Sequence, residues 1–126
     1  MKFDLAFAAP VMLALAIPAA GAAPAADAPD GGALFRQRCQ SCHSVTPGQN
    51  SPLAPNLSGV VGRHAGSTGF NYSSALKASK LVWNRGNLNR FLSGPAKLVP
   101  GTRMVVIVSD PQQRAAIIDY LARTGH

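Results

Sequence analysis

A stretch of 28 residues, from Ser44 to Asn71, is rich in glycine and proline and has no long periodic run of apolar side chains. It reads as a loop, because glycine and proline interrupt helices and strands. So long a loop is uncommon in a compact domain unless it surrounds a ligand or serves a function. The unit expected to fold, residues 30–126, is also small enough to need help from a metal, cofactor or crosslink. We therefore expect the loop to wrap a bulky group. This group, rather than the loop's own hydrogen bonds, would hold the loop in position.

Both cysteines of the chain lie just before this loop, in the motif Cys39-Gln40-Ser41-Cys42-His43. Cys-x-x-Cys-His is typical of covalent c-type heme attachment. The two thiols can add to the two heme vinyl groups from one face, and the adjacent histidine is then carried under the ring, where its imidazole can bind iron. The motif therefore predicts one heme c, bound through two thioethers.

Three other interpretations of the two cysteines compete with heme attachment. A disulfide would close a very small loop and contribute little stability. A thioredoxin-like pair would follow a strand of a βαβ unit, whereas a predicted helix precedes the motif here. A zinc site would need a second pair of ligands, and only His64 and His126 remain as candidates.

The first 22 residues have the pattern of a secretory signal peptide. A positive amino-terminal end precedes an apolar run from Leu5 to Ile17, and Ala20-Gly21-Ala22 is a small-residue cleavage site. The alternative is an uncleaved membrane tether. The apolar run is short for a membrane span, which needs about 20 residues, and this favours cleavage. We expect cleavage, a flexible linker over residues 23–29, and a periplasmic domain over residues 30–126.

Capping residues and helical spacing predict an all-α domain with long loops. The expected helices start after Asp30, cover Ser73–Ser79, start after Asn84 or Asn87 and run to Leu92 before Gly94-Pro95, and start after Asp110 with Pro111 in first position. Met104–Val108 is the only run with strand-like composition.

Met104 is the only methionine outside the leader, which makes it a candidate second axial ligand of a heme iron. The turn sequence Pro100-Gly101-Thr102-Arg103 precedes it and can direct its side chain inward. The ordinary role of a methionine is to fill a gap in a core. His64 and His126 are rival ligands, and we expect both at the surface.

These segments together resemble class I cytochrome c, of the mitochondrial-like and bacterial periplasmic monoheme group. The resemblance implies three main helices and long loops wrapped around one heme, with the first and last helices crossing at Gly31, Phe35, Tyr120 and Leu121. It covers nearly all of residues 30–126. The matching segments are Gly31, Phe35, Pro55-Asn56-Leu57, Gly62-Arg63, Gly69-Phe70-Asn71-Tyr72-Ser73, Trp83, Leu88, Phe91-Leu92, Pro100-Gly101-Thr102-Arg103-Met104, Arg114 and Tyr120-Leu121.

The resemblance implies a role for individual residues. His43 and Met104 would be the axial ligands of the iron, and the backbone carbonyl of Pro55 would accept a hydrogen bond from the His43 imidazole, which fixes the ring. The heme propionates would be surrounded by hydrogen bonds from Arg63, Tyr72 and Trp83.

The chain departs from the family pattern beside the methionine. The family commonly has Asn where this chain has Leu76, and Tyr where it has Phe91. The resemblance implies that those polar groups, with the Thr102 hydroxyl, hold an internal water, and a buried water needs about two to four polar contacts. We predict that this water is absent or displaced here, and that a drier pocket changes the reduction potential and the lability of the methionine.

A heme held by histidine and methionine has both axial positions filled, which leaves no position for a small-molecule substrate. The implied function is a one-electron carrier that cycles Fe(III)/Fe(II), with a thioether that raises the potential, and not an enzyme. The net charge of +7 has a use here, because Arg36, Arg38, Lys97 and Arg103 flank the ligand loops. We expect a monomer that docks transiently, at the heme edge, on acidic redox proteins or membrane electron-transfer complexes, and not on nucleic acid.

Two alternative functions remain open at this point. The first is a heme-bearing subunit of a periplasmic dehydrogenase complex, for which a large exposed apolar patch would be the sign. The second is an enzyme or sensor in which Met104 dissociates and the iron binds a peroxide or a gas. Lys97 is the expected replacement ligand at high pH, because Arg103 stays protonated.

Overall fold

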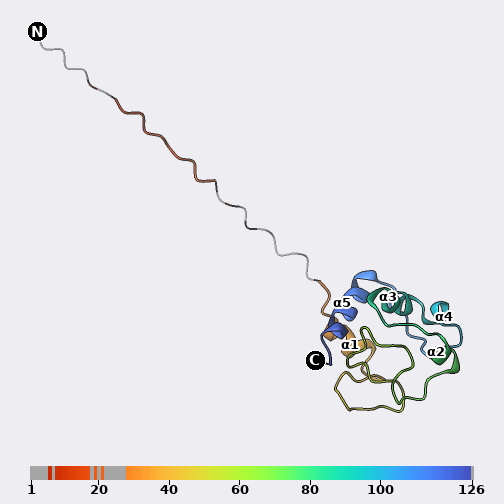
Figure 1. The fold of residues 1–126 in the computed structure, drawn as a ribbon. Coiled ribbons are helices and arrows are strands. Elements are labelled where there is room, and N and C mark those ends of the chain that lie inside the picture. The colour runs from red at the N-terminus through yellow and green to blue at the C-terminus, as the bar shows by residue number, and fades with distance from the viewer. Residues whose placement is uncertain (1–5, 7, 18, 20, 22–27, 126) are drawn as a thin grey trace, which may run out of the picture.

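The computed structural model describes residues 6, 8–17, 19, 21 and 28–125. It contains the helices α1 (Gly31–Arg38), α2 (Ser74–Ala78), α3 (Arg85–Ser93), α4 (Pro95–Leu98) and α5 (Pro111–Ala122). Within the described residues the only β-type pairing is an isolated bridge between His64 and Val82. In Figure 1 the helices gather on one side of the domain, and the loop between α1 and α2 forms the other. The prediction of an all-α fold with long loops is confirmed.

Side-chain caps begin four of the helices: three are the predicted Asp30, Asn84 and Asp110, and the fourth, Ser73, was expected inside its helix. Asp30 accepts hydrogen bonds from the backbone of α1, Ser73 from α2, and Asp110 from α5, which has Pro111 in its first turn. Asn84, rather than Asn87, caps α3, and its side chain accepts from the Asn87 backbone N–H at 2.8 Å.

The sequence did not indicate α4, which begins directly after Gly94. Gly94-Pro95 was expected only to end a helix, but proline also suits the first turn of one, because its missing N–H is not needed there. The strand-like run Met104–Val108 forms no strand. Its residues lie in an irregular segment between α4 and α5.

Helices α1 and α5 cross at the contact that the resemblance implied. The rings of Phe35 and Tyr120 lie 5.4 Å apart between centroids, and Leu121 is buried in the same core. Gly31 allows the close approach, because a Cβ atom there would lie 2.0 Å from the carbonyl oxygen of Ala116. The crossing of α1 and α5 therefore forms a closely packed part of the core.

The long loop makes hydrogen bonds of its own, contrary to the expectation that something else would hold it. The Asn56 amide donates to the carbonyls of Thr46 and Gln49, at 2.7 and 2.8 Å. The backbone of Leu57 also donates to Ser44 at 2.8 Å. The first half of the loop is therefore folded around one asparagine.

Part of the predicted leader lies outside the described residues. This holds for residues 1–5, for Ala20 and Ala22 at the expected cleavage site, and for residues 23–27 of the expected linker, and His126 lies outside them as well. The division into signal peptide, linker and domain therefore stays a prediction. No helix in the part of the chain that the structure describes is long and apolar enough to cross a membrane.

Replacing Gly31 with alanine tests the crossing. A methyl group cannot fit against Ala116, so Gly31→Ala should lower the free energy of unfolding by about 1–3 kcal/mol, the range for overpacking. Gly86→Ala in α3 is the control, because its added Cβ meets nothing closer than 3.5 Å and alanine favours helices. Urea unfolding of the heme-bearing protein measures both. Equal or improved stability of Gly31→Ala would contradict the packing.

Candidate heme site

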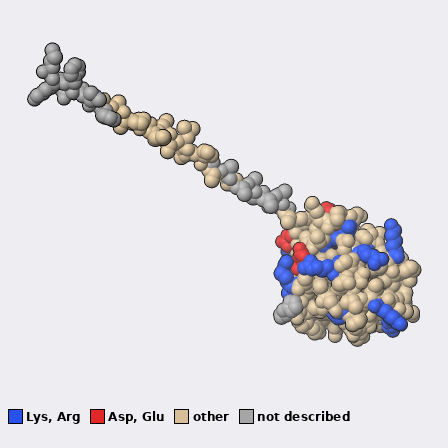
Figure 2. All heavy atoms as spheres, turned by 45° about the horizontal axis from the view of Figure 1, so that its top comes forward, with Lys and Arg blue, Asp and Glu red and all other residues tan. Residues whose placement is uncertain are grey.

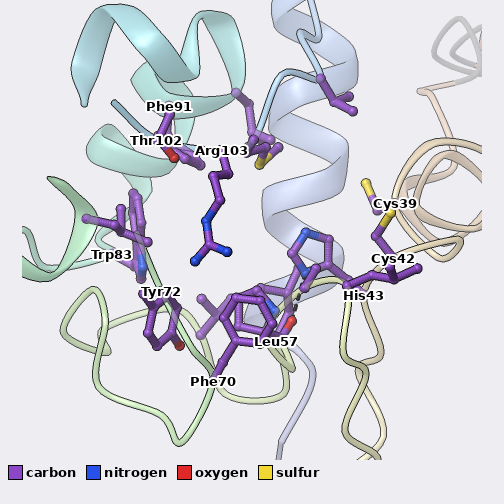
Figure 3. A pocket seen from close by; sticks show the side chains of 18 of the residues that line it. Cys39, Cys42, His43, Leu57, Phe70, Tyr72, Trp83, Phe91, Thr102 and Arg103 are labelled. Carbon is purple, nitrogen blue, oxygen red and sulfur yellow. Dashed lines mark hydrogen bonds between the residues drawn. The ribbon is translucent and has the colours of Figure 1, made fainter. Parts of the chain in front are cut away.

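A cavity of about 310 Å³ lies between the turn after α1, the long loop, helices α2 and α3, and the segment after α4 (Figure 3). Its volume is within the range of sites for small molecules and cofactors. All nine residues predicted to bind the cofactor line it: Cys39, Cys42, His43, Pro55, Arg63, Tyr72, Trp83, Thr102 and Met104. The cavity therefore joins side chains that are far apart in the sequence.

The cysteine motif lies in the turn that ends α1. The carbonyl of Cys39 accepts from the backbone N–H groups of Cys42 and His43, at 3.1 and 2.9 Å. The turn leaves both thiols at one end of the cavity, while the His43 ring points into it (Figure 3). Neither cysteine is in a disulfide, and burial raises the pKa of the Cys39 thiol. No group of three metal-binding side chains that would suit zinc occurs among the described residues.

The imidazole of His43 has a defined tautomer. Its Nδ1 lies 2.7 Å from the carbonyl oxygen of Pro55. A carbonyl can only accept, so Nδ1 carries the hydrogen and Nε2 keeps a lone pair, which is the form that binds a metal. Burial lowers the pKa of His43, against a smaller opposing effect of the bond to Pro55, and this favours the neutral ring. The bond expected from the resemblance is present.

The second candidate ligand, Met104, is half-buried and follows a tight turn. The backbone of Thr102 donates to Val99 at 3.0 Å, and Gly101 takes a left-handed φ of 93° that glycine adopts without strain. Leu76 and Phe91 are buried and line the cavity together with Met104. The absence of an internal water beside the sulfur stays a prediction.

Arg63 carries the polar group that best tests whether a heme fits this cavity. Its Nη1 and Nη2 donate to the carbonyls of Ser58 and Asn56, at 3.2 and 2.9 Å. Its Nε is buried without a partner among the described residues. Buried donors are nearly always satisfied, so an anionic group such as a heme propionate is the expected acceptor. With two thiols, a fixed imidazole and a thioether in one apolar cavity, the residues present fit a heme.

Tyr72 and Trp83 complete this part of the wall. The Tyr72 hydroxyl is hydrogen-bonded to Thr68, a partner that the sequence did not indicate. Trp83 packs on Phe91 with ring centroids 4.9 Å apart. The rival ligand His64 is exposed and does not line the cavity. Sequence reasoning also missed Leu53 and Val106 in the wall, because neither carries a chemical signal.

Fold and cavity together define a class of small proteins built around a covalently bound heme, and comparison with known proteins identifies the family. The cytochrome c family model matches residues 28–125. Cytochrome c2 of Rhodopila globiformis is 45% identical over 103 residues, which is 80% of this chain and 96% of that protein. Cytochrome c of Guizotia abyssinica is 41% identical over 101 residues, 79% of this chain and 91% of that protein.

A solved structure agrees with these relatives. Cytochrome cH from Methylobacterium extorquens is 42% identical, with a TM-score of 0.68, over 75% of this chain and 96% of that one. The chain belongs to the cytochrome c family, in its class I group. Its cofactor is a covalently attached heme c with iron, and its class of function is electron transfer.

Two variants of Arg63 separate its charge from its hydrogen bonds. Arg63→Gln removes a positive charge from the cavity wall, which favours the ferric state, so the reduction potential should fall by on the order of 50 mV. Arg63→Lys keeps the charge but loses the fork that holds Asn56 and Ser58, so it should lower stability by about 1–3 kcal/mol with a smaller change in potential. Redox titration and urea unfolding measure the two effects. Equal reduction potentials in the wild-type protein and both variants would contradict a contact between Arg63 and the propionates.

Proposed function

We propose that this protein is a periplasmic one-electron carrier in which His43 Nε2 and the Met104 sulfur are the axial ligands, and Cys39 and Cys42 hold the heme. The observation that carries the proposal is the bond between His43 and Pro55, which leaves Nε2 as the free nitrogen in the cavity that Met104 also lines. When bound, the heme iron exchanges one electron between its ferric and ferrous states. Met104 contributes a soft thioether, which favours the ferrous state.

The surrounding residues would hold the site rigid and dry. Leu76, Leu88 and Phe91 are buried apolar residues of the cavity wall and would exclude water from the cavity. Arg63, Tyr72 and Trp83 would hold the propionates. With His43 and Met104 as its protein ligands, the iron would have no position left for a substrate, and we assign no catalytic residue.

Export by a cleaved signal peptide over residues 1–22 is part of the proposal. The leader has the pattern of a secretory signal, and the heme-attachment motif follows it in the same chain. Residues 11–17 are mostly apolar and contain no charge. Retention of this segment as a membrane tether is the alternative.

The distribution of charge favours acidic partners. Residues 28–125 contain eleven Lys or Arg against three Asp. Each of these carboxylates is engaged, because Asp30 and Asp110 cap helices and Asp119 pairs with Arg85 at 2.5 Å. In Figure 2 the visible acidic atoms lie near the junction with the N-terminal segment, whereas Lys and Arg are spread more widely. The cavity wall carries three arginines and no acid, so we propose transient docking of acidic redox partners at this face.

One observation favours the second candidate, a heme-bearing subunit of a periplasmic dehydrogenase. Val105, Val106 and Ile107 are consecutive apolar residues after Met104, and Ile107, which does not line the cavity, is 51% exposed. An exposed apolar patch at this edge of the cavity would mark a contact site. A stable complex that copurifies with the protein would select this function, and a free monomer would select the carrier.

Replacing Met104 tests the axial ligand. Met104→Ala should abolish the far-red absorption band of the sulfur–iron bond in the ferric protein. It should also lower the reduction potential by on the order of 0.1–0.3 V, within the range that axial ligands span. His64→Ala is the control and should change neither property, because His64 lies at the surface outside the cavity. A normal far-red band in Met104→Ala would exclude this methionine as a ligand of the iron.

Ionic strength tests the docking. The second-order rate of electron transfer to an acidic redox protein should fall steeply as salt rises, because screening weakens the steering field. Lys97→Gln should slow transfer at low salt, whereas Arg123→Gln at the end of α5 should have a smaller effect. A rate that stays flat from low to high salt would reject electrostatic docking.

A further inference from the structure

The segment that carries Met104 is weakly held by its own backbone. Thr102 N–H donates to Val99 at 3.0 Å before the methionine, and Val108 N–H donates to Leu92 at 2.8 Å after it. Within the described chain, residues 103–107 make no backbone–backbone hydrogen bond. Ile107, which does not line the cavity, is also 51% exposed, so apolar packing holds the end of the segment weakly. Side chains from elsewhere therefore help to hold the segment in position.

Arg38 is the side chain that reaches this segment from the cysteine motif. It lies in the last turn of α1, directly before Cys39. Its Nη2 donates to the carbonyl oxygen of Ile107 at 3.2 Å, and its Nη1 donates to Oε1 of Gln113 in α5, also at 3.2 Å. One planar guanidinium therefore joins the end of α1, the methionine segment and α5, with a rigid geometry that lysine cannot reproduce.

Two further arginines, Arg103 and Arg114, donate hydrogen bonds at the two ends of the segment. Arg103, next to the methionine, donates to the carbonyl of Asn71. Arg114 donates to the carbonyls of Val108 and Ser109, at 2.9 and 2.8 Å. Between Met104 and Val108, the bond from Arg38 is the only hydrogen bond to the backbone among the described residues.

We propose that Arg38 is a positioning residue for Met104, which holds the methionine segment against the cavity through the Ile107 carbonyl while Gln113 orients its guanidinium. The inference rests on the proposed role of Met104 as a ligand. Losing the bond would let the segment move outward more often. An added ligand would then compete better with the methionine sulfur for the iron.

Imidazole titration of the full-length ferric protein, followed at the far-red band, measures this competition. Arg38→Gln should raise the apparent imidazole affinity about three- to tenfold, a modest effect because the contact is exposed. Arg38→Lys should recover only part of the loss. Gln113→Glu should shift the affinity in the opposite direction, because a charged acceptor strengthens the bond that orients Arg38.

Arg36→Gln is the matched control. Arg36 is exposed on the same helix and carries the same charge, and no hydrogen bond joins it to the methionine segment in the described chain. Unchanged imidazole affinity in Arg38→Gln, or an equal rise in Arg36→Gln, would overturn the inference while leaving the proposed ligand intact. A wild-type protein without the far-red band would overturn the proposed function, and the inference with it. Gln113→Glu keeps the test valid if Arg38→Gln folds poorly.

Discussion

The hydrogen bond from His43 Nδ1 to the carbonyl of Pro55, at 2.7 Å, connects two parts of the chain. One part is the turn that ends α1, and the other is the long loop. The bond fixes the imidazole tautomer and ring orientation, and it defines where the loop must pass. Asn56, the residue after Pro55, donates hydrogen bonds from its side chain to the carbonyls of Thr46 and Gln49. The carbonyl of Pro55 therefore lies in an ordered part of the loop. The irregular loop is thus a structural wall of the site.

The buried side chains of this small domain surround the cavity as much as they pack on one another. The crossing of α1 and α5 supplies a compact base, where Gly31 lies against Ala116. Leu88 and Phe91 of α3, by contrast, are buried in the core and also line the cavity. A domain of this length buries too little surface to be very stable alone, and a covalently bound heme adds the apolar surface that these walls pack against.

Local signals in the sequence predicted much of this architecture. Asp30 and Asp110 mark helix starts through bonds to backbone groups two or three residues away. The cysteine motif is contiguous in the sequence. What could not be predicted depends on distant parts of the chain. Asn84 and Asn87 were equivalent candidates as caps until Asn87 is seen to donate to the carbonyl of Val82. The contact between Arg38 and Ile107 joins residues 69 positions apart, and no local pattern encodes it.

If the heme completes the core of this chain, a full-length Cys39→Ala/Cys42→Ala variant should lose its structure, and circular dichroism measures this most directly. Without covalent heme, we expect a strongly reduced helical signal and no cooperative thermal transition, because the cavity walls lose the surface they pack on. A variant with native-like helical content and a cooperative transition would contradict the claim, since its helices and long loop would then be stable on their own.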